Sequence, residues 1–173
     1  MRAAIPRCAA VLLALTLLCS CARAQRFGVW ELEKRLCEAD GKYAFDTEGM
    51  FRKEGVYHVF YRTENGTLLL KAKEDGKQRL TGLSLTVRQT DPETAAAFSA
   101  LSLTLADVFL PEESRADAKA ALRLADPGSF FTDETLTAEY GRYRAVFFKT
   151  TQGASLMLEY VTREAESADR AAP

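Results

Sequence analysis

The chain has 173 residues, of which 47% are hydrophobic and 27% charged, and its formal net charge is −1 at pH 7. This balance fits one folded domain and excludes a collagen, a long disordered tail and a multi-span membrane protein. Residues 1–20 hold two arginines and no acidic residue, which leaves 21 Lys and Arg against 24 Asp and Glu in the rest of the chain. The folded part therefore lacks the basic excess of nucleic-acid-binding domains, and we expect no nucleic acid partner.

The amino terminus predicts an export signal. Arg2 and Arg7 precede an apolar run from Cys8 to Cys19. This run has the length of a signal-peptide core and is shorter than the roughly 20 residues that a membrane-spanning helix needs. We therefore expect residues 1–20 to be a signal peptide and the protein to be exported.

Two cleavage patterns follow the apolar run. Leu18-Cys19-Ser20-Cys21 resembles the lipobox of bacterial lipoproteins, although Cys19 departs from the Ala, Ser or Thr usual at that position. The resemblance implies lipidation of Cys21, a short tether over residues 21–27 and a membrane anchor on the extracytoplasmic side. Ala22-Arg23-Ala24 instead matches the A-x-A pattern of ordinary signal peptidase, and cleavage at Ala24 would release a secreted protein. In either case Cys37 is the one cysteine left in the folded domain, so no internal disulfide is expected.

Residues 28–162 are expected to form a single α+β domain that starts with a helix. Apolar residues at three- and four-residue steps predict this helix over 27–39, where Trp30 would pack the helix against the rest of the domain. Gly28-Val29-Trp30 also resembles the lipocalin signature, which implies a ligand-binding barrel. The helical pattern at Trp30 and the two helices expected in mid-chain have no place in that barrel.

The next segment predicts an antiparallel meander. Short alternating or apolar runs at 43–45, 56–63, 68–73 and 80–89 read as strands. Asn65-Gly66 and Asp75-Gly76 separate the last three runs and suit tight hairpin turns, because these residues tolerate positive φ angles.

The second half of the domain predicts two helices followed by three strands. Asp91 caps a helix that ends before Pro111, and Ser114 caps another that runs to residue 125. Strands are expected at 135–140, 143–150 and 155–161, and residues 163–173 form a flexible polar tail.

An internal similarity relates the two halves. Residues 59–66 and 146–153 agree in several apolar, Thr and Gly positions at a spacing of 87, which suggests a duplication of about 28–90 and 91–162. Two such units would join edge to edge. The predicted fold is therefore an antiparallel sheet of six to seven strands, built from two related hairpin units, with three helices packed mainly on one face.

Catalytic patterns are not found in the sequence. His58 is the one histidine and lies in the middle of a predicted strand, and the acidic pairs lie at turns or helix starts, where carboxylates cap helices or stay solvated. The motifs of phosphate, dinucleotide, zinc and calcium sites are also missing. We expect no enzyme activity, no metal and no cofactor.

The remaining candidate is a binding surface on the sheet. If helices cover one face, strand alternation leaves one set of side chains on the other, and the set that mixes aromatic and cationic groups comprises His58, Phe60, Arg62, Phe147 and Lys149. Such a surface could bind an envelope protein or a glycan. The expected function is a non-catalytic extracytoplasmic lipoprotein that serves as a binding or accessory module of the bacterial cell envelope. The alternative is a secreted or tethered carrier of a small apolar ligand, which requires an enclosed pocket between helices and sheet.

Overall fold

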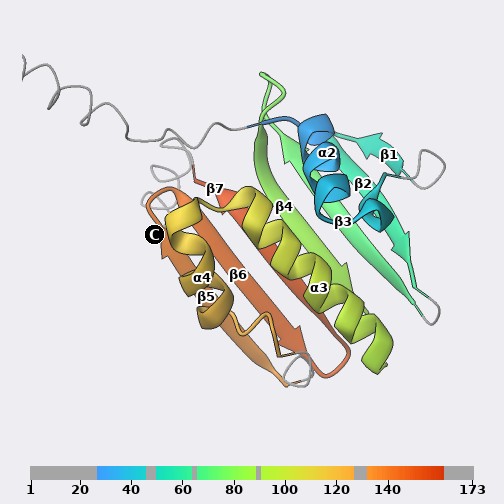
Figure 1. Cartoon of the computed structure of the whole chain (residues 1–173), viewed down its shortest axis with the longest axis vertical. Helices are drawn as coiled ribbons and strands as arrows, with labels where there is room; N and C mark the ends of the chain where they lie inside the picture. Colours follow the sequence, from blue (N-terminus) through green and yellow to red (C-terminus); the bar gives the residue numbers. More distant parts are fainter. Residues whose placement is uncertain (1–26, 46–49, 64–65, 89–90, 127–131, 162–173) are drawn as a thin grey trace, which may run out of the picture.

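The computed structural model describes residues 27–45, 50–63, 66–88, 91–126 and 132–161. Seven strands form one antiparallel sheet with the order β1-β2-β3-β4-β7-β6-β5. They are β1 (Met50–Lys53), β2 (Val56–Arg62), β3 (Thr67–Glu74), β4 (Leu80–Val87), β5 (Glu134–Tyr140), β6 (Tyr143–Thr150) and β7 (Gly153–Tyr160). Three helices lie in front of this sheet in Figure 1: α2 (Val29–Ala39), α3 (Pro92–Phe109) and α4 (Glu112–Ala121). The predicted α+β class, strand number and helix placement are confirmed.

The helix boundaries follow from local chemistry. The side chain of Asp91 accepts a hydrogen bond from the Thr94 amide at 2.9 Å and so caps α3, as the sequence predicts. Helix α2 has Gly28 before its first turn, and the Val29 amide donates instead to the Glu74 carboxylate of β3 at 2.7 Å. This contact satisfies a free helix amide and places negative charge at the positive end of the helix dipole.

The start of α4 differs from the prediction. The helix begins at Glu112 after Pro111, and the Ser114 hydroxyl donates to the Pro111 carbonyl at 2.8 Å. Proline fixes the backbone angle that a first helical turn requires, so the helix starts before the serine.

The core fills the space between the helices and one face of the sheet. Phe98 of α3 stacks on Phe147 of β6 with ring centroids 5.9 Å apart, and both side chains are fully buried. Phe109, near the end of α3, meets Tyr143 edge to face at 5.8 Å. Helix α3 lies over the middle of the sheet, while α2 and α4 cover its two ends (Figure 1).

Two predictions in the first half are wrong. Residues 43–45 are not a strand: a 3₁₀ turn, η1 (Gly41–Tyr43), occupies this place, and the Asp40 side chain accepts from the Lys42 amide. Strand β1 was not predicted, because its four residues are too few for a periodic pattern. Its hairpin to β2 turns at Glu54 and Gly55, whose φ angles are 52° and 79°. Both residues of the turn are therefore left-handed, as a tight hairpin requires.

The two halves meet at the pairing of β4 with β7, where Leu85 lies opposite Leu156. This is the edge-to-edge joint that the similarity of the halves predicts, while the duplication itself stays a prediction. The spacing of 87 does not relate equivalent positions, however. It matches Val59 of β2, which faces the helices, with Val146 of β6, which faces away from them. At the joint β4 lies beside β7, and the next strand outward is β3 in the first half and β6 in the second. Strand β6 therefore occupies the position of β3 and not that of β2.

Candidate functional site

One face of the sheet has no helix over it among the described residues, and we call it the open face. Strand alternation assigns its side chains, because the buried residues of each strand point to the helices. Cross-strand pairing then arranges them in rows across the sheet. One row runs Phe60, Leu69, Thr86, Ser155, Phe148, Thr135, and the next runs Phe51, His58, Lys71, Ser84, Met157, Val146, Thr137.

The part of the open face over β1, β2 and β3 is basic and aromatic, and we call it the basic patch. It comprises Phe51, Lys53, His58, Phe60, Arg62, Leu69, Lys71 and Lys73. Its four cations form no ion pair with any residue in the described part of the chain. Elsewhere in the described ranges Arg52, Lys77, Arg88 and Arg115 also have no ion pair, while eight cations have carboxylate partners: Lys34, Arg35, Lys42, Arg79, Lys119, Arg123, Arg144 and Lys149. Positive charge on this patch is therefore uncompensated, in a chain whose net charge is −1.

An aromatic stack forms the centre of the basic patch. The rings of Phe51 and His58 are parallel with centroids 4.5 Å apart, and Phe60 follows 6.1 Å from Phe51. Phe51 and Phe60 remain 48% and 37% exposed, so the stack stands in contact with solvent. The Nδ1 atom of His58 is buried beneath it and has no hydrogen-bond partner among the described residues.

A second region, the seam trough, follows the joint between the halves. Its lining includes Thr86 of β4 and Ser155 of β7, whose hydroxyls lie 3.1 Å apart, while Ser84 and Gly82 follow along β4 on the same face. Beside Ser155, the exposed ring of Phe148 borders a hollow of about 400 Å³.

Gly82 is not required by the fold. A Cβ atom at Gly82 would meet its nearest neighbour, the Leu158 carbonyl oxygen, at 3.7 Å, which is ordinary contact. Glycine inside a strand weakens that strand, and its presence there often marks a place where another molecule approaches the backbone. Gly82 also lies beside the register shift of the β3–β4 pairing at Lys73 and Glu74, and a glycine in a strand often accompanies such an irregularity.

The predicted binding residues lie on opposite faces. His58, Phe60 and Arg62 share the open face, whereas Phe147 and Lys149 point to the helices and are 0% and 3% exposed. The prediction that these five residues form one surface is therefore wrong. The spacing of 87 aligned Phe60 with Phe147, but cross-strand pairing through Leu69, Thr86 and Ser155 places Phe148 on the same face as Phe60.

Lys149 has a structural role instead. Its ammonium forms an ion pair of 2.5 Å with the Glu134 carboxylate of β5, and its own side chain is fully buried. Arg123 approaches the same carboxylate at 3.7 Å. The hydrogen bond from Lys149 lowers the pKa of Glu134 below its usual value, which keeps the carboxylate charged beside the buried amine.

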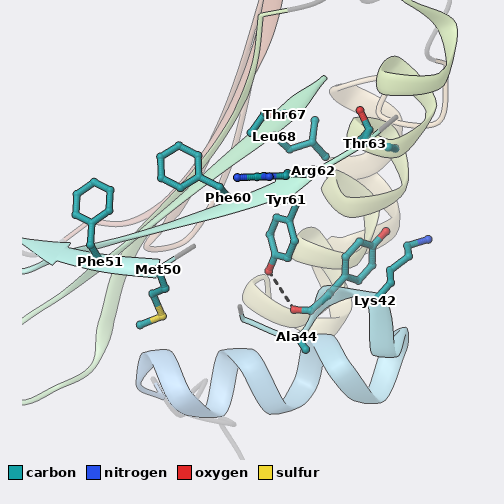
Figure 2. A pocket seen from close by; sticks show the side chains of 12 residues that line it. Lys42, Ala44, Met50, Phe51, Phe60, Tyr61, Arg62, Thr63, Thr67 and Leu68 are labelled. Carbon is teal, nitrogen blue, oxygen red and sulfur yellow. Dashed lines mark hydrogen bonds between the residues drawn. The ribbon is translucent and has the colours of Figure 1, made fainter. Parts of the chain in front are cut away.

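A cavity of about 1020 Å³ opens at the edge of the sheet, between η1 and the end of β2 (Figure 2). Its walls include the charged Lys42 and Arg62, and the Tyr61 hydroxyl donates to the Tyr43 carbonyl at 3.1 Å. Burial raises the pKa of the Tyr61 hydroxyl, which stays protonated as that donor. Ala97 of α3 and Leu68 of β3 also line this cavity, so it extends from the sheet edge into the space between the helical layer and the sheet.

Several predicted features fall elsewhere. Cys21, the predicted lipidation site, lies outside the described residues. Trp30 of α2 is 61% exposed, and its ring meets that of Tyr57 of β2 edge to face with centroids 6.3 Å apart, so it makes a partial contact between this helix and the sheet. Val29, Leu32 and Leu36 of the same helix are fully buried in the core.

Within the described ranges, no group of three or more acidic, His or Cys side chains could hold a metal ion. No helix in those same ranges has both the length and the apolar character needed to cross a bilayer.

Several members of the open face were not part of the predicted surface, among them Phe51, Lys53, Lys71, Lys73 and Phe148. The alternation in Leu70-Lys71-Ala72-Lys73 could have identified both lysines, since it places small or apolar residues inside and cations outside. Phe51 belongs to the unpredicted β1. Comparison with known proteins adds nothing to these assignments: no family model, no curated protein and no solved structure matches the chain.

Proposed function

We propose that the protein is a non-catalytic binding module of the bacterial cell envelope, exported and held at the membrane by a lipid on Cys21. The observation that supports this proposal is the open face. Among the described residues the seven-stranded sheet has no helix over one side, and that side presents exposed aromatic rings, cations without an ion pair and a hollow beside Phe148. Exposed aromatic and arginine side chains concentrate binding energy at interfaces.

The seam trough is the part of the open face that suits an envelope macromolecule best. Phe148 supplies an apolar contact at its border, while Thr86 and Ser155 supply hydroxyl groups on its floor. A protein segment or a glycan chain could use both, because each combines apolar surface with hydrogen-bonding groups.

A blocking substitution tests the trough. Ser155→Arg places a long side chain over the floor beside Phe148, and the matched control Ala116→Arg adds the same group to the exposed side of α4. Each variant is crosslinked in its own host and its adducts are compared by mass. We expect Ser155→Arg to lose adducts that the wild type and Ala116→Arg both form. Identical adduct profiles for all three proteins would exclude the trough as the binding surface.

The anchor has its own test, which is the intact mass and amino-terminal sequence of the protein recovered from its host. An acylated amino terminus at Cys21 is expected. A chain that starts at unmodified Gln25 would replace the anchored protein by a secreted one.

A further inference from the structure

We propose that the basic patch is a membrane-docking surface that lies on anionic phospholipid headgroups. The proposal goes beyond partner binding in the seam trough, and it relies on the proposed lipid anchor only for the nearness of a bilayer. It gives the domain a fixed orientation, whereas the anchor alone would let it tumble.

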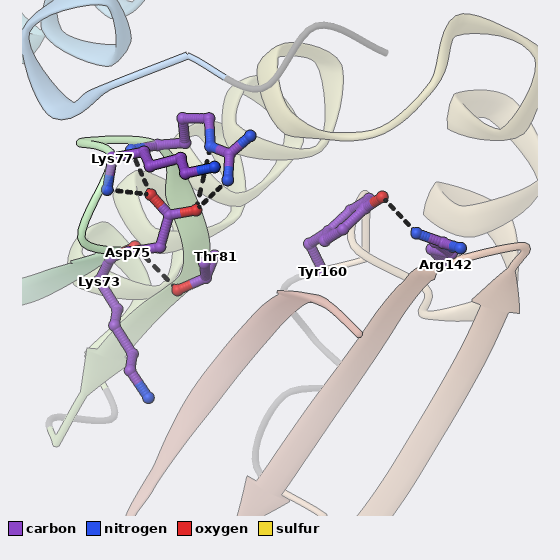
Figure 3. A network of polar contacts seen from close by, with 7 residues as sticks. Lys73, Asp75, Lys77, Thr81, Arg142 and Tyr160 are labelled. Carbon is purple, nitrogen blue, oxygen red and sulfur yellow. Dashed lines mark hydrogen bonds and ion pairs between the residues drawn. The ribbon is translucent and has the colours of Figure 1, made fainter. Parts of the chain in front are cut away.

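Uncompensated charge is the first argument. Lys53, Lys71 and Lys73 are exposed and, with Arg62, lack a carboxylate partner in the part of the chain that the structure describes. Figure 3 shows the Lys73 side chain extending away from the Asp75 carboxylate, which instead binds Arg79 at 2.7 Å. Lys71 and Lys73 are two residues apart on one strand, so their ammonium groups lie on the same face. Clustered cations of this kind are attracted to the negative surface of an anionic leaflet.

Exposed aromatic rings are the second argument. Phe51 and Phe60 lie between the lysines and Arg62 and expose about half and a third of their surface, at 48% and 37%. Amphipathic surfaces that rest on bilayers combine apolar rings with Lys and Arg in this way, because the rings enter the interfacial region while the cations stay at the phosphates.

The position of the chain entry is the third argument. The Phe27 carbonyl accepts a hydrogen bond from the Leu80 amide at 2.7 Å, so the chain enters the domain at the end of the sheet where β3 ends and β4 begins. Lys73 lies one residue before the end of β3. Val56 of β2 pairs with Lys73 on one side and with Lys53 of β1 on the other, so both lysines lie at this end of the sheet. The six residues from Cys21 to Phe27 span at most about 20 Å. An anchor at Cys21 therefore holds these two lysines within reach of the bilayer surface.

Sheet twist explains why this patch alone would dock. Neighbouring strands rotate by roughly 20–25° relative to each other, so a plane can touch only about three of seven strands. On the open face, strands β1, β2 and β3 carry four cations that form no ion pair within the described ranges, whereas β5, β6 and β7 carry Glu139 and Glu159 with Arg144. Docking through the first three strands also leaves the seam trough accessible.

The test uses the protein from Gln25 onward, the form that cleavage at Ala24 would release, which lacks both the apolar run of the predicted signal peptide and the acyl acceptor Cys21. Its sedimentation with vesicles of equal phosphatidylglycerol and phosphatidylcholine is compared with that on pure phosphatidylcholine. We expect binding to the anionic vesicles only, and a loss of binding as salt rises from 0.05 to 0.5 M, because the attraction is screened. Lys71→Gln with Lys73→Gln should weaken this binding about 30-fold, or about 5-fold for each cation removed.

The control pair Lys34→Gln with Lys119→Gln removes the same charge from the helices over the other face and should leave vesicle binding unchanged. Equal weakening by both pairs would overturn the proposal, as would equal binding to both kinds of vesicle. Soluble polyglutamate that binds more tightly than the vesicles would also overturn it, since the partner would then be an acidic peptide. Ser155→Arg should still dock on vesicles, so failure of the trough and failure of the patch are distinguishable.

Discussion

Gly153 and Gly82, in the paired strands β7 and β4, differ in whether the backbone around them leaves space for a side chain. At Gly153, which begins β7, a Cβ atom would lie 2.2 Å from the Val87 carbonyl oxygen, whereas Gly82 has space for one. The close approach of β7 to the end of β4 therefore needs Gly153, while no steric contact requires glycine at position 82.

Alanine substitution should separate these two roles. We expect Gly82→Ala to raise the free energy of unfolding by about 0.5–1 kcal/mol, because it removes the entropy cost of glycine in a strand. Gly153→Ala should lower it by about 1–3 kcal/mol through overpacking against the backbone. Urea unfolding of both variants measures the difference, and a Gly82→Ala protein less stable than wild type would show that the fold does need this glycine.

The Lys149–Glu134 pair predicts an asymmetry between its partners. Glu134→Gln leaves the buried ammonium without its counter-charge and should lower the thermal midpoint at pH 7, whereas Lys149→Met replaces the amine by an apolar group of similar length and should lower it less. The effect of Glu134→Gln should shrink as the pH falls through the depressed pKa of Glu134, because the wild-type carboxylate then also loses its charge. Thermal unfolding at pH 7 and pH 3 tests both statements. An equal fall for the two variants would contradict them.

At the scale of elements, hairpin turns show what a sequence can and cannot indicate. Asp75-Gly76 correctly predicts a turn, but the connection between β3 and β4 spans five residues and its left-handed residue is Gln78, with φ 54°. The Asp75 carboxylate organises this turn, since it accepts from the amides of Lys77 and Arg79 and from the Arg79 guanidinium (Figure 3). The Asp-Gly pattern reflects the backbone preferences of two residues only. It therefore does not predict the length of a turn whose conformation is set by the hydrogen bonds of a side chain.

Acid should loosen this turn. The Arg79 side chain lowers the pKa of Asp75 to about 2, so the stabilisation by Asp75 is complete above its unfolded pKa near 3.8 and is lost as the pH falls towards 2. We expect Asp75→Asn to flatten the loss of stability between pH 4 and pH 2 in urea unfolding. Arg79→Gln should flatten the same interval, because it removes the main cause of the shift, and an unchanged slope in both variants would contradict this assignment.

Most helices and strands were predictable because their apolar periodicity extends over seven residues or more. The segments 56–63, 143–150 and 91–111 agree with β2, β6 and α3 within two residues. The candidate site was less predictable, because it depends on which face each strand presents. A single-residue change of register moves every side chain of a strand to the other face, and this is how Phe147 and Phe148 exchanged places between prediction and structure.

At the scale of the whole molecule, the joint between β4 and β7 places the best-protected strands at the centre and the shortest strand, β1, at one edge. Strand β1 pairs through four residues and three of them are exposed. We expect the amides of β4 and β7 to exchange hydrogen only through global unfolding and those of β1 to exchange far faster. Hydrogen exchange measured by mass spectrometry tests this order, and slow exchange in β1 would show that the edge is covered in solution.

The burial of Lys149 has a further, practical consequence. Acylating reagents attack the neutral amine of a lysine and must reach it, yet this amine lies beside the Glu134 carboxylate with 0% of its side chain exposed. Exposed lysines such as Lys34, at 66%, should react at once. Lys149 can react only when β5 and the chain above it move away, so the rate at which its peptide gains the label reports that opening motion directly. The acylation rate of Lys149 therefore measures how often β5 opens away from β6 in the folded protein.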